Sequence, residues 1–156
     1  MKAKEGVVEF LNRVLRSELT VVHQYLLDAA MCKHWGYERL HEHFSHLPTE
    51  EVSHSSGLID HILYLEGTPD VEHLDQMSRG RSVADLFTAD LEFERKDVEL
   101  LRKAIAHCAK VGDFTTRHML EDMIEDSEDH VDWFETQLRT IGQIGLNRYL
   151  AEHIKK

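Results

Sequence analysis

Glu51 and His54 have the spacing of a metal-binding pair on a helix. In an E-x-x-H segment, both side chains lie on one helical face, about one turn apart. Apolar residues surround the pair at steps of three and four, the pattern of a buried helical face: Leu40, Phe44, Leu47, Leu58, Ile62 and Leu65. A buried carboxylate costs several kcal/mol unless it is paired or bound to a metal. We therefore expect Glu51 to have a partner.

The two halves of the chain repeat this pattern at an offset of 76 residues, the separation of His54 from His130. Polar residues occupy apolar stripes at corresponding places, and apolar pairs keep the same offset on either side of them. The polar pairs are Glu18 with Glu94, Glu51 with Ser127, and His54 with His130. The repeat predicts two helical hairpins related by a pseudo-twofold axis, with these residues meeting in the middle of a four-helix bundle.

The apolar periodicity predicts four long helices, a short fifth helix and no strand. The expected helices cover residues 5–33, 38–66, 83–111, 114–141 and 146–154. Residues 67–82 lack periodicity and are rich in turn formers, which suits a long crossover between the two hairpins. Pro48 should bend or interrupt the second helix, because it lacks a backbone donor. Gly142 and Gly145 should break the fourth.

The converging residues are a ligand set for two metal ions. A bundle can hold such a pair with one Glu from each of two helices and Glu-x-x-His from each of the others. Carboxylates neutralise and bridge two divalent cations, and mixed carboxylate and imidazole ligation suits iron, manganese or zinc. One E-x-x-H alone is a weak signal, but two half-sites at one offset, all within apolar stripes, are a strong one.

On these residues the chain resembles bacterioferritin, the bacterial iron-storage protein. The similarity covers nearly the whole chain, with the segments LNRVLRSELTVVHQYLLDAAM, HWGYERL, ILYLEGTPD, DHVDWFETQL and IGLNRYL. The resemblance implies an all-α fold: a single ferritin-like domain over residues 1–156, built as a four-helix bundle with a long crossover and a short fifth helix. It also implies a shell of 24 subunits that oxidises Fe(II) to Fe(III) and stores the mineral, for iron storage and detoxification.

By matching position, the resemblance assigns the metal ligands. Glu18 and His54 would bind one iron, Glu94 and His130 the other, and Glu51 would bridge them. These five residues would carry the ferroxidase activity. Two further residues, His46 and Glu50, fall where the family has an iron site on the inner surface of the shell.

Two positions depart from the family pattern. Ser127 replaces the second bridging glutamate, so three carboxylates face two Fe(II) ions and one positive charge is left over. We expect weaker binding on the His130 side and slower oxidation. Asp126 and Glu128 lie about 100° around the helix from Ser127 and should not substitute for the glutamate. Val52 stands where the family has the methionine that binds haem between subunits, so haem ligation by this route should be lost.

The departures leave a second interpretation open, that of a structural subunit with little or no activity. Such a chain would co-assemble with a complete, haem-binding bacterioferritin subunit into a mixed cage. A buried ion pair without metal is the plain alternative for Glu51 and His54, but it leaves Glu18 and Glu94 without partners. A rubrerythrin-like peroxidase should carry a C-x-x-C pair, and a DNA-protecting mini-ferritin a basic tail; this sequence has neither.

The composition indicates which classes of binding partner and which cellular compartment to expect. The chain is 42% hydrophobic and 30% charged, typical of a soluble helical protein, and its net charge of −11 disfavours nucleic acid and anionic membranes as partners. Cys32 and Cys108 form no motif, which suits reduced thiols. We find no signal peptide and no run of about 18 apolar residues, and expect a cytoplasmic protein.

Overall fold

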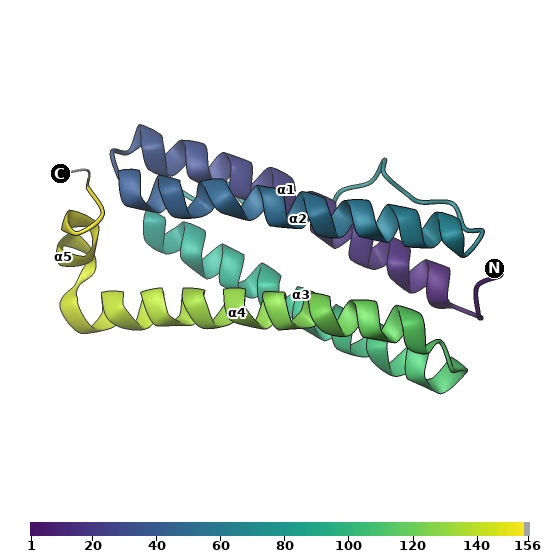
Figure 1. Ribbon diagram of the computed structural model, residues 1–156. Helices are drawn as coiled ribbons and strands as arrows, with labels where there is room; N and C mark the ends of the chain where they lie inside the picture. Colours follow the sequence, from purple (N-terminus) through teal and green to yellow (C-terminus); the bar gives the residue numbers. More distant parts are fainter. Residues whose placement is uncertain (155–156) are drawn as a thin grey trace.

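The predicted helices form four long rods and a short fifth helix in the computed structural model, which describes residues 1–154 (Figure 1). No strand occurs in this part of the chain. The helices are α1 (Val7–His34), α2 (Glu38–Tyr64), α3 (Val83–Val111), α4 (Phe114–Ile144) and α5 (Leu146–Ala151). None of them is both long and apolar enough to cross a bilayer. The all-α, ferritin-like bundle with a short C-terminal helix is therefore confirmed.

The bundle consists of two antiparallel hairpins, α1 with α2 and α3 with α4, that face each other along their length (Figure 1). The crossover from α2 runs back along the bundle, so that α3 starts at the end where α1 stops. Side chains at every fourth position of α1 hold this segment by hydrogen bonds to its backbone: Asn12, Arg16, Thr20 and Gln24. One face of α1 thus fixes a segment that has no regular structure of its own.

Polar side chains and glycines mark the ends of the long helices in the second hairpin. Ser82 Oγ accepts a hydrogen bond from the Asp85 backbone N–H, and the Asp113 carboxylate accepts one from Thr116 N–H. Gly112 has a φ of 75°, a left-handed conformation that favours glycine, and it ends α3 as expected.

Two predicted interruptions and one predicted helix end differ from the structure. Pro48 does not interrupt α2, which continues on both sides of it. Its ring is buried, and the flanking Phe44, Leu47 and Glu51 are buried too, so packing holds both halves in one helix despite the missing hydrogen bond. Gly142 lies inside α4, which ends at Gly145, and α5 stops at Ala151 rather than at residue 154.

The core is divided into two apolar clusters. One lies toward α5 and is rich in aromatic residues: Tyr25, Phe44, Phe87, Phe134 and Tyr149 are buried in it. The other lies toward the opposite end and is mainly aliphatic, with Leu11, Leu15, Leu58, Leu101 and Leu120 among its members. Buried polar residues from all four long helices fill the space between the clusters.

A second buried acidic contact joins α1 to α3 away from this polar layer. Asp28 and Asp90 interact as buried neighbours, Oδ2 of each has no hydrogen-bond partner in the described part of the chain, and Gln24 Nε2 donates to Asp28 Oδ1 over 2.9 Å. Burial raises the pKa of Asp28 to about 6, although its hydrogen bonds pull the other way. For Asp90, burial and the neighbouring Asp28 raise the pKa well above its usual value.

Asp28→Asn should therefore stabilise the fold at neutral pH. The raised pKa of Asp28 favours the protonated form, so its contribution to folding is complete below pH 3.8 and is lost as the pH rises through about 6. At pH 7 the variant should gain up to about 3 kcal/mol in unfolding free energy, and near pH 4 almost nothing. Urea unfolding across this range measures the difference. The exposed Asp60→Asn on α2 is the control and should change little; an equal effect of both variants would contradict the prediction.

Candidate metal centre

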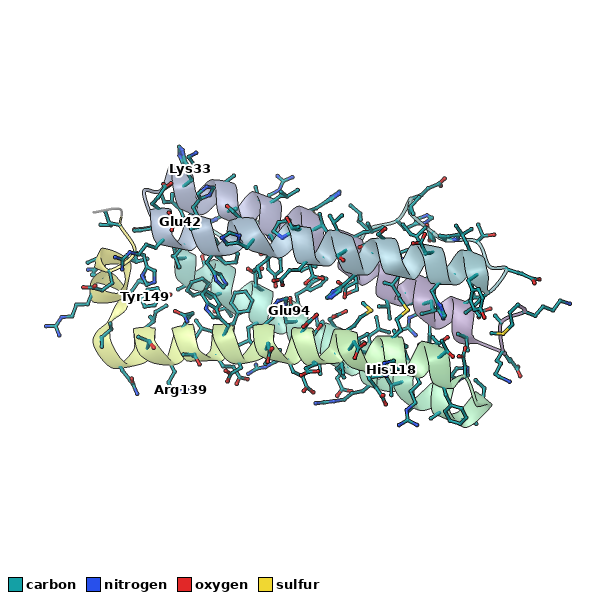
Figure 2. All side chains as sticks on the ribbon, in the orientation of Figure 1. Lys33, Glu42, Glu94, His118, Arg139 and Tyr149 are labelled. Carbon is teal, nitrogen blue, oxygen red and sulfur yellow. The ribbon has the colours of Figure 1, made fainter. Side chains whose placement is uncertain are left out.

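Five of the polar residues between the two core clusters form two groups with the geometry of metal sites. Glu18, Glu51 and His54 offer ligand atoms within 4.8 Å of one another, and so do Glu51, Glu94 and His130. The residues come from all four long helices, and Glu51 belongs to both groups. Figure 2 shows Glu94 in the middle of the bundle, between the two hairpins. The structure thus brings together the five residues predicted as ligands.

The Glu51 carboxylate lies between the two histidines and turns one oxygen toward each. His54 Nδ1 is 3.3 Å from Glu51 Oε2, and His130 Nδ1 is 3.7 Å from Glu51 Oε1. Each histidine also faces the glutamate of its own side: His54 Nδ1 is 3.5 Å from Glu18 Oε2, and His130 Nδ1 is 3.3 Å from Glu94 Oε1. The two sides of the cluster are the two predicted half-sites, and the assignment of one ion to each side stays a prediction.

The outer nitrogen of each histidine meets a carboxylate from the opposite hairpin. His54 Nε2 lies 2.9 Å from Asp126 Oδ2 of α4, and His130 Nε2 lies 3.7 Å from Glu50 Oε2 of α2. Glu50 and Asp126 obey the same 76-residue repeat and precede the histidines by four positions. A carboxylate at Nε2 favours the tautomer whose Nδ1 is free to bind a metal. The sequence analysis missed this role for both residues, although the repeat contains the signal.

The three glutamates are only 2–3% exposed, and their protonation reflects that burial. Burial raises the pKa of Glu18 well above its usual value, and the charges of Asp97 and Glu51 raise it further. Burial also acts to raise the pKa of Glu51, but hydrogen bonds with Glu18 and His54 outweigh it and lower the pKa. Without a cation, Glu18 therefore favours the neutral form and Glu51 the charged form.

The carboxylates hold both histidines toward their charged form. The hydrogen bond with Glu51 raises the pKa of His54 despite partial burial. Burial lowers the pKa of His130, but Glu94, Glu51 and Glu50 raise it to a net value of about 9. An entering metal ion must therefore displace a proton from each imidazole, as is usual for ligand sets of this kind.

Ser127, the residue in place of the second bridging glutamate, is buried beside α3. Its Oγ donates a hydrogen bond of 2.9 Å to Asp97 Oδ2 on α3. Tyr25 Oη, in turn, donates to Glu94 Oε1 and orients that carboxylate from the aromatic side of the core. Asp97 was not predicted as a site residue, although it follows Glu94 by three positions and so shares its helical face.

The remaining predicted positions lie outside both ligand groups. His46 and Glu50 are exposed on α2, where an inner-surface iron site stays a prediction. Val52 is also on α2, and 52% of its side-chain surface is exposed, so it faces away from the ligand groups.

The donor set fits a pair of divalent cations. Glu18 Oε2 is buried without a hydrogen-bond partner, an expensive state that a bound cation would relieve. Imidazole and carboxylate ligands together are typical of iron, manganese and zinc sites.

Comparison with known proteins gives the family. The ferritin-like domain profile matches residues 8–144. The chain is 37% identical to a bacterial ferritin of Synechocystis sp., over 99% of both chains. The chain belongs to the bacterioferritin family. Among other relatives, a bacterial ferritin of Pseudomonas aeruginosa is 37% identical over 99% of this chain and 100% of its own. A bacterioferritin of Mycolicibacterium paratuberculosis is 33% identical over 100% and 98%.

Glu51→Gln should weaken both metal positions of this bacterioferritin-family chain, because Glu51 is the one residue that both groups share. Isothermal titration with Zn(II), which does not change oxidation state, should give two ions per wild-type subunit. We expect one for Glu18→Gln and at least about tenfold weaker binding of both for Glu51→Gln, a loss of about 1.4 kcal/mol per ion. The exposed Glu42→Gln on α2 is the control. Two ions at wild-type affinity in Glu51→Gln would refute the shared role.

Proposed function

We propose that this chain is an iron-storage subunit that binds two Fe(II) ions in the bundle and oxidises them to Fe(III). The observation that supports this most is the pair of buried carboxylate–histidine groups that share Glu51. Glu18 and His54 would hold one ion, and Glu94 and His130 the other. Membership of the bacterioferritin family supports iron as the metal and oxidation as the chemistry.

The iron ions are substrate and cargo in this scheme. Each Fe(II) gives up one electron, and dioxygen accepts both electrons with two protons to form hydrogen peroxide. The side chains bind and orient the ions: carboxylates offset their charge, and Asp126 and Glu50 hold the imidazoles with Nδ1 inward. Metal binding would release protons from the two histidines. These protons would be available close to the position where oxygen is reduced.

Ser127 should make this reaction slower than a second bridging carboxylate would. A neutral hydroxyl offsets no charge, and its proton is committed to Asp97. Ser127→Glu should therefore speed the oxidation of the first two Fe(II) per subunit by about tenfold or more, about 1.4 kcal/mol in activation free energy. Rapid mixing of Fe(II)-loaded protein with oxygenated buffer, followed by absorbance, measures the rate. Ser127→Ala is the size control, and a wild-type rate equal to that of Ser127→Glu would contradict the prediction.

We further propose that the chain is a single domain that assembles into a closed shell of 24 subunits in the cytoplasm. Several large apolar side chains have more than half of their surface exposed, more than an isolated bundle needs and suitable for subunit contacts: Leu26, Val52, Leu63, Tyr64, Val71 and Phe114. Because valine has no ligand atom, the shell formed by this chain alone should lack haem bound through position 52.

The mass of the assembly tests this proposal. At 18.2 kDa per subunit, native mass spectrometry of the purified chain should find a particle of about 440 kDa without haem absorbance. Leu26→Arg, at an exposed apolar position, should shift the particle toward smaller species, while the polar-face control Lys103→Glu should not. A monomer or dimer as the largest wild-type species would refute the shell.

A structural subunit of a mixed cage is the second candidate, favoured by the combination of Ser127 and Val52. Co-expression with a complete, haem-binding bacterioferritin subunit distinguishes the two. Mixed particles combined with no metal binding in the bundle of this chain would support the structural role over the catalytic one.

A further inference from the structure

A fourth buried carboxylate, that of Asp97, lies beside the candidate metal centre. It stands on α3, one helical turn beyond Glu94, and only 4% of its surface is exposed. No ion pair to Asp97 exists within residues 1–154, so its charge has no cationic partner there. A buried carboxylate without a cation is costly, and this one lies beside Ser127, the residue in place of the second bridging glutamate.

Two serine hydroxyls hold Asp97 from both sides. Ser17 Oγ on α1 donates to Oδ1 over 2.7 Å, and Ser127 Oγ on α4 donates to Oδ2 over 2.9 Å. Burial and the charge of Glu94 raise the pKa of Asp97 to about 7, although each carboxylate oxygen accepts one hydrogen bond that favours the charged form. The side chain on α3 is therefore fixed in place by residues of two other helices, α1 and α4.

Asp97 also lies close to the ligands of the candidate centre. A narrow space in the bundle is lined by Asp97 together with the three glutamates of the centre. The Asp97 carboxylate is thus a neighbour of the ligands, although it is not a member of either ligand group.

We propose that Asp97 is the fourth carboxylate of the metal centre and supplies, through the Ser127 hydroxyl, the charge that the missing glutamate would carry. This inference rests on the proposed binding of two Fe(II) ions. With Asp97 included, four carboxylates balance the four positive charges of two divalent ions. Since the Ser127 hydroxyl donates its hydrogen bond to Asp97, the lone pairs of the Ser127 oxygen stay available to a cation. Ser17 and Ser127 thereby become positioning residues for Asp97.

Asp126 is a poorer candidate for the same role. It is about half exposed and contacts the outer nitrogen of His54, on the far side of the imidazole from the ligand groups. Its charge is therefore screened by solvent, and its carboxylate orients the His54 imidazole. Asp97, by contrast, is buried and hydrogen-bonded to Ser127, the residue in place of the second bridging glutamate.

Zn(II) titration of Asp97→Asn tests the proposal with a readout that does not depend on oxidation. The amide is close in shape to the carboxylate and removes only its charge and one acceptor. Wild-type protein should bind two Zn(II) per subunit, and Asp97→Asn should bind one of them at least about tenfold more weakly. The matched control is Asp90→Asn, which is equally buried on α3 but contacts Asp28, and it should retain both ions.

A second variant separates the charge role from a structural one. In the Ser127→Glu background the bridging carboxylate is restored, so Asp97→Asn should cost less than about threefold in affinity. A structural role would instead produce the same loss in both backgrounds, which would overturn the proposal. Two Zn(II) at wild-type affinity in Asp97→Asn would overturn it as well, while leaving the proposed function intact. Fewer than two in the wild type would overturn both.

Discussion

The burial of carboxylates at the middle of the bundle is the constraint on which the rest of the structure depends. Glu18, Glu51 and Glu94 are almost fully enclosed, and no Lys or Arg within residues 1–154 pairs with them. Protons and two histidines compensate in part, which is why the pKa of Glu18 and that of His130 rise. A bundle that keeps such groups in its core gives up stability, and the proposed cation binding supplies the reason.

The pseudo-twofold relation of the hairpins explains how so few residues make a two-sided centre. Each hairpin provides one histidine and one carboxylate that contacts the outer nitrogen of the other hairpin's histidine. Asp126 contacts His54, and Glu50 contacts His130. The supports cross between hairpins, so correct docking of the two halves orients both imidazoles at once. The apolar clusters on either side then hold that docking in place.

The repeat of the polar residues is broken at Ser127, and the structure places another carboxylate, that of Asp97, beside it. Where the repeat predicts a glutamate, Ser127 brings no charge, and its hydroxyl is hydrogen-bonded to Asp97. On α4 itself, the sequence neighbours Asp126 and Glu128 lie about 100° around the helix from Ser127. The relevant carboxylate belongs to α3, and only the packing of α3 against α4 brings it to Ser127.

The sequence by itself determined the helices, the crossover, the family and the five residues that meet in the core. These follow from local periodicity and from the repeat, both of which are visible in the sequence without any distance between helices. The tertiary structure alone decided that α2 continues through Pro48, that Glu51 faces both histidines, and that Ser127 bonds to Asp97. Each of these depends on contacts between helices distant in the chain, where packing outweighs the local preference of a single residue.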